Sequence, residues 1–220
     1  MSAAADDAPV SRRELIRQAA TELFAQCGFR GTTIRAIAER AGVDPALVMH
    51  YFGSKEKVFS AVIREAMRAE TFLPEVLDGT DEDLGRRLLR AFLRRWEDPD
   101  TQPLLLVVFR SAMEHPEASR LFREVASGEI LLPLADRLET PEPQLRAVAL
   151  GSLLVGLVSG RYVVRVESLA DMTLDAVVDL FGPYAEQMIS GRGDVDAPVP
   201  GTLRGAPGVG AESAPSGARD

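Results

Sequence analysis

Apolar residues at the start of the chain recur at the spacing of an amphipathic helix. After Ser11 they come in pairs every four residues, at Leu15/Ile16, Ala19/Ala20 and Leu23/Phe24. This period places the pairs on one face of a helix. Ser11 and Glu14 have the spacing of a capping box, in which hydroxyl and carboxylate satisfy each other's free amides. Gly28 supplies a left-handed stop. The pattern predicts a first helix between Ser11 and Gly28.

Two short helices and a longer one are predicted next. A helix over residues 33–41 has its apolar positions on one face and ends at Gly42. A third helix, over residues 44–52, begins with an aspartate cap and has Pro45 at its first position, where the missing amide costs nothing. A Gly-Ser pair then breaks the chain, and an amphipathic helix is expected from about residue 55 to residue 72.

The remaining pattern is also helical. No alternating run of apolar and polar residues is long enough to favour a strand. Proline and glycine positions predict helices near residues 81–97, 103–114, 116–139, 143–168 and 173–189. The sequence therefore predicts an all-α fold, in which an N-terminal three-helix unit is followed by a larger helical domain.

The two ends of the chain have a different composition. Residues 191–220 contain seven Gly and four Pro with few large apolar side chains, so they bury too little surface to offset the entropy of ordering. We expect this tail, and residues 1–10, to be disordered. The predicted units between them are residues 11–55 and residues 56–190.

Charge is distributed unevenly along the chain. The net charge is −8, yet residues 11–60 contain eight basic and five acidic residues, a surplus of three positive charges. An acidic protein that begins with a small basic unit is typical of contact with a polyanion through that unit. A random fluctuation on a solvated surface is the alternative explanation.

Several classes of protein are excluded by composition. The single cysteine, Cys27, rules out a disulfide framework, and we expect it to pack as a small core residue rather than to act as a redox sensor. One cysteine and two distant histidines do not make a zinc site, so no metal or cofactor is expected. The longest uncharged stretch has 14 residues, so we expect no membrane span and a cytoplasmic protein.

The first three helices have the arrangement of a DNA-binding motif. The second and third are separated only by Gly42, Val43 and Asp44, which is the tight turn of a helix-turn-helix whose second helix enters the major groove. Residues 31–59, GTTIRAIAERAGVDPALVMHYFGSKEKVF, resemble the TetR family of bacterial transcriptional repressors in order and spacing. Farther along, residues 160–172 resemble a late helical segment of one subgroup of that family.

The resemblance implies which residues contact DNA. The family's reading helix corresponds to residues 44–51, and Arg35 corresponds to a position that reaches a base edge. The groove-facing positions hold few polar side chains, so thymine methyl contacts are expected there, with His50 and Arg35 as polar readers. The candidates are Thr32, Thr33, Arg35, Pro45, Ala46, Leu47, Met49, His50, Tyr51 and Lys55. The threonines as helix caps, the lysines as a solvated face and Tyr51 as part of the core are the alternatives.

The larger domain contains aromatic and methionine residues that are candidates for lining a cavity. We expect a largely apolar effector that is oriented by one polar group, such as Arg110 or His115. The candidate ligand-binding residues are Phe92, Trp96, Phe109, Arg110, Met113 and Tyr162. Ordinary core packing is the alternative for each of them.

The segment over residues 145–166 is apolar nearly all round, which requires burial on several sides. With the last helix it resembles the paired helices through which repressors of this family dimerise as a four-helix bundle. The candidate interface residues are Leu150, Leu153, Leu154, Leu157, Arg161, Val177, Leu180 and Phe181. Burial within one subunit is the alternative.

The sequence thus predicts a repressor, and not an enzyme, that binds an inverted-repeat operator on double-stranded DNA as a homodimer and is released by a small apolar ligand. A helical-bundle enzyme is disfavoured because no Glu-x-x-His pair, phosphate loop or nucleophile motif is present. A protein-interaction adaptor without DNA binding remains an alternative, because its reading face would be apolar.

Overall fold

The computed structural model describes residues 11–79 and 81–190, and every regular element within these ranges is a helix. The N-terminal helices are α1 (Arg12–Gly31), α2 (Ile34–Ala41), α3 (Pro45–Phe52) and α4 (Lys55–Met67). The next are α5 (Ala69–Leu77), the turn η1 (Asp81–Asp83), α6 (Leu84–Glu97) and α7 (Gln102–Glu114). The last are α8 (Pro116–Ala126), η2 (Ser127–Leu131), α9 (Leu132–Arg137), α10 (Pro143–Val158), η3 (Ser159–Val163), α11 (Glu167–Ala170) and α12 (Leu174–Ser190). The predicted all-α fold is confirmed.

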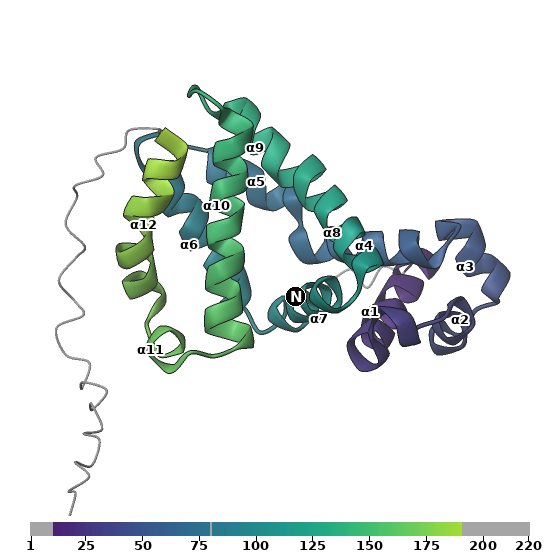
Figure 1. Cartoon of the computed structure of the whole chain (residues 1–220). Helices are drawn as coiled ribbons and strands as arrows, with labels where there is room; N and C mark the ends of the chain where they lie inside the picture. The colour runs from purple at the N-terminus through teal and green to yellow at the C-terminus, as the bar shows by residue number, and fades with distance from the viewer. Residues whose placement is uncertain (1–10, 80, 191–220) are drawn as a thin grey trace, which may run out of the picture.

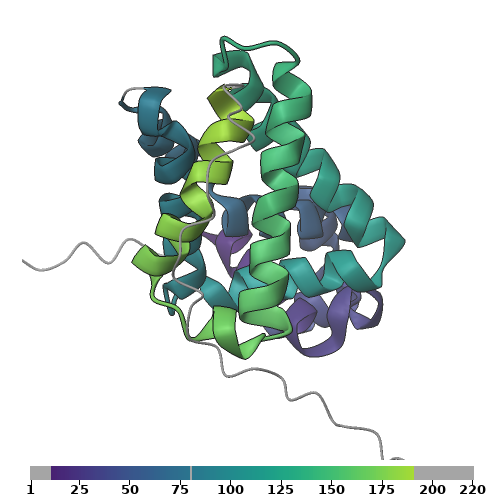
Figure 2. The same ribbon diagram turned by 60° about the vertical axis from the view of Figure 1, so that its left-hand side comes forward.

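The helices form a small unit and a larger one. Figure 1 shows α1, α2 and α3 grouped at one end of the molecule, with α4 leading from them into the larger group of helices. At the opposite end α10 and α12 lie side by side, as the turned view in Figure 2 also shows. The disorder predicted for residues 1–10 and 191–220 concerns segments outside the described residues.

Side-chain caps fix the start of each N-terminal helix. The hydroxyls of Ser11, Thr33 and Ser54 and the carboxylate of Asp44 each accept a hydrogen bond from an amide in the first turn of α1, α2, α4 and α3, respectively. The capping box at Ser11 is only half formed, because the Glu14 carboxylate accepts hydrogen bonds from side chains one turn later in α1.

The fourth helix is shorter than the apolar pattern predicts. It ends at Met67 because Arg68 adopts a left-handed conformation with φ of 41°, and α5 then begins in a new direction. The apolar period continues across this break, since Phe72, Leu73 and Val76 of α5 are all buried. The change of direction at Arg68 therefore could not be predicted from the apolar pattern.

The two long helices predicted in the larger domain are interrupted by wider π-helical turns. The segment predicted over residues 116–139 contains η2, and the segment predicted over residues 143–168 contains η3. The second segment ends early, because Arg165 is left-handed with φ of 57° and the short α11 follows. Each turn moves the following side chains around the helix axis.

The closest contact in the larger unit joins α6 to α12. Gly85 of α6 lies so near the backbone of α12 that a Cβ atom there would be 2.5 Å from the amide nitrogen of Glu186. The Glu186 carboxylate accepts a hydrogen bond of 2.9 Å from the backbone N–H of Arg86, in the first turn of α6. Glycine is therefore needed at position 85 for the two helices to meet.

One segment, Pro143–Val163, is long and apolar enough to span a membrane by length and composition alone. It packs against α9 and α12, and its Arg161 is paired with Glu97 of α6. Only 28% of its most apolar window is buried. This helix belongs to the domain core on one side, and its other side leaves apolar surface for a further contact.

Candidate nucleic-acid interface and effector cavity

The turn between α2 and α3 has helix-turn-helix geometry. Gly42 is left-handed, with φ of 66° and ψ of 34°, and the amide of Val43 donates to the carbonyl of Ala38 across 3.0 Å. The carboxylate of Asp44 then accepts a hydrogen bond of 2.7 Å from the amide of Ala46. Together these contacts stop α2 and start α3 within three residues.

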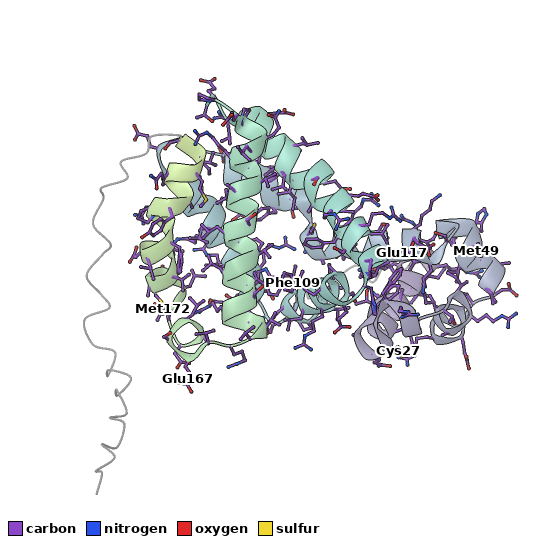
Figure 3. The ribbon with its side chains drawn as sticks, in the orientation of Figure 1. Cys27, Met49, Phe109, Glu117, Glu167 and Met172 are labelled. Carbon is purple, nitrogen blue, oxygen red and sulfur yellow. The ribbon has the colours of Figure 1, made fainter. Side chains whose placement is uncertain are left out.

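The side chains of α3 divide between the small core and solvent. Val48 and Phe52 are buried. Pro45, Ala46, Met49, His50 and Tyr51 are exposed, and Leu47 is half-buried. Figure 3 shows Met49 at the end of the molecule farthest from the larger domain. The face that the resemblance assigns to the major groove is thus free of contacts with the body of the protein, and its middle is apolar.

The two threonines before α2 have different environments. Thr32 is only 1% exposed, and its hydroxyl donates to the Gly28 carbonyl across 2.8 Å. Its position is thus structural, which corrects the expectation that Thr32 contacts DNA. Thr33 is exposed and caps α2 by accepting from the amide of Ala36 at 3.2 Å. Arg35 is exposed two residues farther on, with no hydrogen bond or ion pair to another described residue.

Lys55 at the start of α4 is engaged within the protein. Its ammonium donates to the carbonyl of Phe29 across 3.0 Å and lies 4.5 Å from the centre of the Phe29 ring. This contact ties the end of α1 to the start of α4. Lys57, two residues later, is exposed and has no ion pair among the described residues.

Sequence reasoning did not single out Arg13. This exposed residue lies at the start of α1, and its guanidinium carbon is 5.3 Å from the centre of the Phe52 ring at the end of α3. It adds a positive charge beside the reading helix. The only signal in the sequence was the basic character of the N-terminal unit.

The larger unit contains a cavity of about 500 Å³, within the range of small-molecule sites. Its wall is made by α4, α5, α6, α7, α8, η2, α9 and α10, and apolar side chains dominate it. Met67, the last residue of α4, is part of the wall. The cavity therefore touches the helix that leads to the reading unit, as we expect of an effector site.

The predicted ligand-binding residues divide into three groups. Phe92, Trp96 and Phe109 line the cavity. Tyr162 is not part of the wall, but its ring stacks on Trp96 with the two centres 5.5 Å apart. Arg110 and Met113 do not line the cavity: both lie on the exposed side of α7, and Met113 is 65% exposed. The polar residue expected to orient a ligand is thus not Arg110.

Two other arginines line the cavity instead. Arg95 of α6 is half-buried; it donates to the Ala66 carbonyl across 2.5 Å, and its guanidinium carbon is 6.0 Å from the centre of the Phe72 ring. Burial lowers the pKa of Arg95, and the positive charge of Arg68 adds to this effect. Arg123 of α8 lies at the exposed edge of the wall.

Half of the predicted dimer residues are buried within the chain itself. Leu150, Leu157, Arg161 and Val177 are each at most 7% exposed, so they cannot form a face for a partner, and this corrects their assignment. Leu153, Leu154, Leu180 and Phe181 are half-buried. α10 instead exposes Leu145, Val148, Ser152 and Gly156, a stripe at helical spacing, in which Val148 and Ser152 also line the edge of the cavity.

Arg161 has a clear structural position. Its guanidinium donates to the Glu97 carboxylate across 2.8 Å, to the Leu169 carbonyl across 2.5 Å and to the Tyr162 hydroxyl across 3.1 Å. These bonds connect η3 to α6 and to α11.

In the described ranges, no three histidine, cysteine or acidic side chains are grouped so as to hold a metal ion. Cys27 is exposed, which corrects the expectation that it packs in the core.

A helix-turn-helix unit joined by one helix to a helical domain with an apolar cavity defines a class of DNA-binding transcriptional regulators. Family comparisons make this specific. The model for "Bacterial regulatory proteins, tetR family" matches residues 16–62, and that for "Tetracyclin repressor-like, C-terminal domain" matches residues 82–189. A TetR-family regulator from Streptomyces coelicolor A3, known from its crystal structure, is 31% identical with a TM-score of 0.69, over 86% of this chain and 99% of that chain. The chain belongs to the TetR family.

Named relatives match it to different extents. The HTH-type transcriptional repressor AcnR of Corynebacterium efficiens is 42% identical over 89 residues, which are 38% of this chain and 47% of AcnR. The HTH-type transcriptional regulator BetI of Rhizobium meliloti is 28% identical over 199 residues, 87% of this chain and 96% of BetI. The chain thus spans about half the length of the AcnR relative that it matches.

Proposed function

We propose that this protein is a cytoplasmic repressor that binds an inverted-repeat operator as a homodimer and is released from DNA by a small, largely apolar molecule. The observation that carries the proposal is the course of α4, which begins beside the reading unit at Lys55 and ends in the cavity wall at Met67. The name of the AcnR relative supports repression rather than activation.

Base recognition is assigned to the exposed side of α3 and to Arg35. Ala46 and Met49 provide apolar contacts suited to thymine methyl groups, whereas His50 and Arg35 provide hydrogen-bond donors for base edges. Thr33, Tyr51 and Lys57 are exposed around this face and are assigned to phosphates. Lys55 would have to leave the Phe29 carbonyl to reach a phosphate, so its primary task is to hold α4 against α1.

Dimerisation is assigned to the outward stripe of α10 together with Leu180 and Tyr184 of α12. Leu145, Val148 and Tyr184 of this surface are exposed in the single chain, and Leu180 is half-buried. Two-fold pairing through it would present two reading helices, which must lie about 34–36 Å apart to enter successive major grooves. A change in this separation is sufficient to prevent simultaneous binding of both half-sites.

Release requires a ligand whose affinity differs between the two separations. The cavity is suited to this, because Met67 and Arg95 connect its wall to the end of α4. A ligand that shifts either residue shifts the helix that carries the reading unit.

The test is selection of bound fragments from a random pool of duplex DNA. We expect an inverted repeat, with affinity that falls steeply as salt concentration rises. Arg35→Ala should relax the preference at one base pair of each half-site, whereas Arg94→Ala, which removes an exposed charge on α6, should not. Retention of no specific sequence would refute the proposal.

A protein-interaction adaptor is the alternative, favoured only by the apolar side chains of Ala46, Leu47 and Met49 on the reading face. An adaptor would show no salt-dependent binding to duplex DNA of any sequence. The same titration therefore separates the two functions.

A further inference from the structure

The indole of Trp96 is a buried hydrogen-bond donor in the wall of the cavity. We propose that the cavity selects apolar molecules that carry an acceptor oxygen, and that the Trp96 N–H donates to this oxygen. The proposal rests on the proposed function of the cavity as the effector site, and it names the chemical class of the effector.

Aromatic neighbours hold the indole in one place. Trp96 is 3% exposed, its ring stacks on Tyr162 at an interplanar angle of 19°, and the Phe109 ring stands perpendicular to it with the centres 6.0 Å apart. Phe92, one turn earlier in α6, is also in ring contact. Because the indole is held in one orientation, a ligand in the cavity must place its acceptor along the direction of the N–H bond.

Among the described residues, the indole Nε1–H has no hydrogen-bond acceptor, and the nitrogen itself is covered, so a ligand oxygen reaches it only when a neighbouring side chain of the wall moves. Tryptophan nitrogen is a donor only, and a buried donor without a partner is costly. Three other polar side chains of the wall have partners within the protein: Arg95 donates to the Ala66 carbonyl, Ser152 to the Val148 carbonyl and Arg123 to the Ser119 hydroxyl. The fourth, Ser127, is exposed to solvent. The buried group of the wall that lacks a partner is therefore the Trp96 N–H, which needs an acceptor.

The charges of the cavity wall further restrict the chemical class of the ligand. Arg95 and Arg123 line the cavity, and no aspartate or glutamate does so among the described residues. A cationic ligand would meet positive charge without a counter-charge, which excludes it. A neutral carbonyl compound and a carboxylate both supply the acceptor oxygen, and Arg95 distinguishes them.

Two probes of equal shape test the acceptor directly. 2-Undecanone has a carbonyl oxygen where 2-methyl-1-undecene has a methylene group, and the rest of the two molecules is the same. Their affinities are measured by displacement of the neutral apolar dye N-phenyl-1-naphthylamine from the full-length protein. We expect the ketone to bind about tenfold more tightly than the alkene, which is the effect of one hydrogen bond gained in an apolar site.

Trp96→Phe keeps an aromatic ring and removes the donor. In this variant the preference for the ketone should disappear or reverse in favour of the alkene, because the buried carbonyl then loses its hydrogen bond to water without gaining a partner. Arg110→Ala is the matched control, since Arg110 lies outside the cavity and the tenfold preference should persist. Trp96 is also the only tryptophan of the chain, so the ketone, but not the alkene, should shift its fluorescence to longer wavelength.

Decanoate gives the second arm of the experiment. If the effector is an anion, decanoate binds more tightly than the ketone, and Arg95→Met weakens the binding of decanoate alone. If the effector is neutral, the ketone is the tighter ligand, and Arg95→Met changes the affinities of both ligands equally. Either result supports an acceptor at Trp96 provided that Trp96→Phe weakens the tighter ligand about tenfold.

Equal affinity of ketone and alkene for the unaltered protein would overturn the inference. A preference for the ketone that survives in Trp96→Phe would also overturn it. Neither result contradicts the proposal that the cavity is an effector site. If neither probe displaces the dye or perturbs the tryptophan emission, the cavity does not accept apolar molecules of this kind. That result overturns the proposed effector function together with the inference.

Discussion

The contact between α6 and α12 at Gly85 gives a stability prediction whose sign is decided by two opposing effects. A Cβ atom at this position would lie 2.5 Å and 2.6 Å from backbone atoms of α12. Ordinary contact begins near 3.4 Å, so the helices would have to separate by about 0.9 Å in Gly85→Ala. Backbone atoms of a packed helix do not move aside as a side-chain end does. Overpacking of this kind costs about 1–3 kcal/mol.

Alanine also favours the helix by up to about 1 kcal/mol over glycine. Because the clash is with the backbone of α12, we expect it to prevail, with a net loss of about 1–2 kcal/mol. For a domain of this size the loss corresponds to a decrease in melting temperature of about 2–8 °C. The measurement is thermal unfolding followed by far-ultraviolet circular dichroism at fixed protein concentration.

Gly128→Ala is the control for this prediction. Gly128 is exposed in η2, and a Cβ atom there would meet nothing within 4 Å. The control should be neutral or more stable by a few tenths of a kcal/mol. If Gly85→Ala is as stable as this control, the close approach of α6 and α12 does not exist in solution.

Three further predictions concern other parts of the molecule. Lys57→Ala should weaken binding to cognate and scrambled duplexes alike and lower the salt slope by about one, because a phosphate contact has no sequence preference; a loss confined to cognate DNA contradicts this. Burial raises the pKa of Glu186, so the folded protein retains this proton longer than the unfolded chain and loses stability as pH rises from the ordinary carboxyl pKa through the raised pKa. Glu186→Gln should remove that loss, which denaturant titrations of both proteins across the acidic range would measure. Gly156→Ala should stabilise a monomer but weaken the dimer in sedimentation if a partner helix covers the α10 stripe; an unchanged dimer places the interface elsewhere.

Local chemistry explains why the N-terminal part could be predicted so closely. The caps at Thr33, Asp44 and Ser54 and the left-handed Gly42 depend only on residues within one turn, and each is present in the structure. The break at Arg68 has no such signal, because a non-glycine residue with positive φ is imposed by packing on both sides. The end of α4 was therefore placed five residues too late.

The sequence pattern could not predict which apolar residues lie in the core and which lie on the surface. A helix that is apolar nearly all round does not show which side meets its own chain, so Leu150 and Leu157 were assigned to a partner although α10 buries them. Phe109 and Met113 were both expected to line the cavity. The buried side of α7 continues from Phe109 to Ala112, and Met113 lies one residue beyond it and is exposed.

The cavity and the reading unit are connected at the end of α4, and the chemistry there determines what a ligand can change. Arg95 and Trp96 are neighbours in α6; one donates to the Ala66 carbonyl in the last turn of α4, and the other presents the unpaired donor of the wall. A ligand that draws the indole toward its oxygen moves the same turn of α6 that carries the arginine. Because the Arg95 side chain is also placed against Phe72 of α5, such a movement is transmitted to both sides of the break at Arg68. Under the proposed function, the position of α4 would then depend on occupancy of the cavity, which is the condition that release from an operator requires.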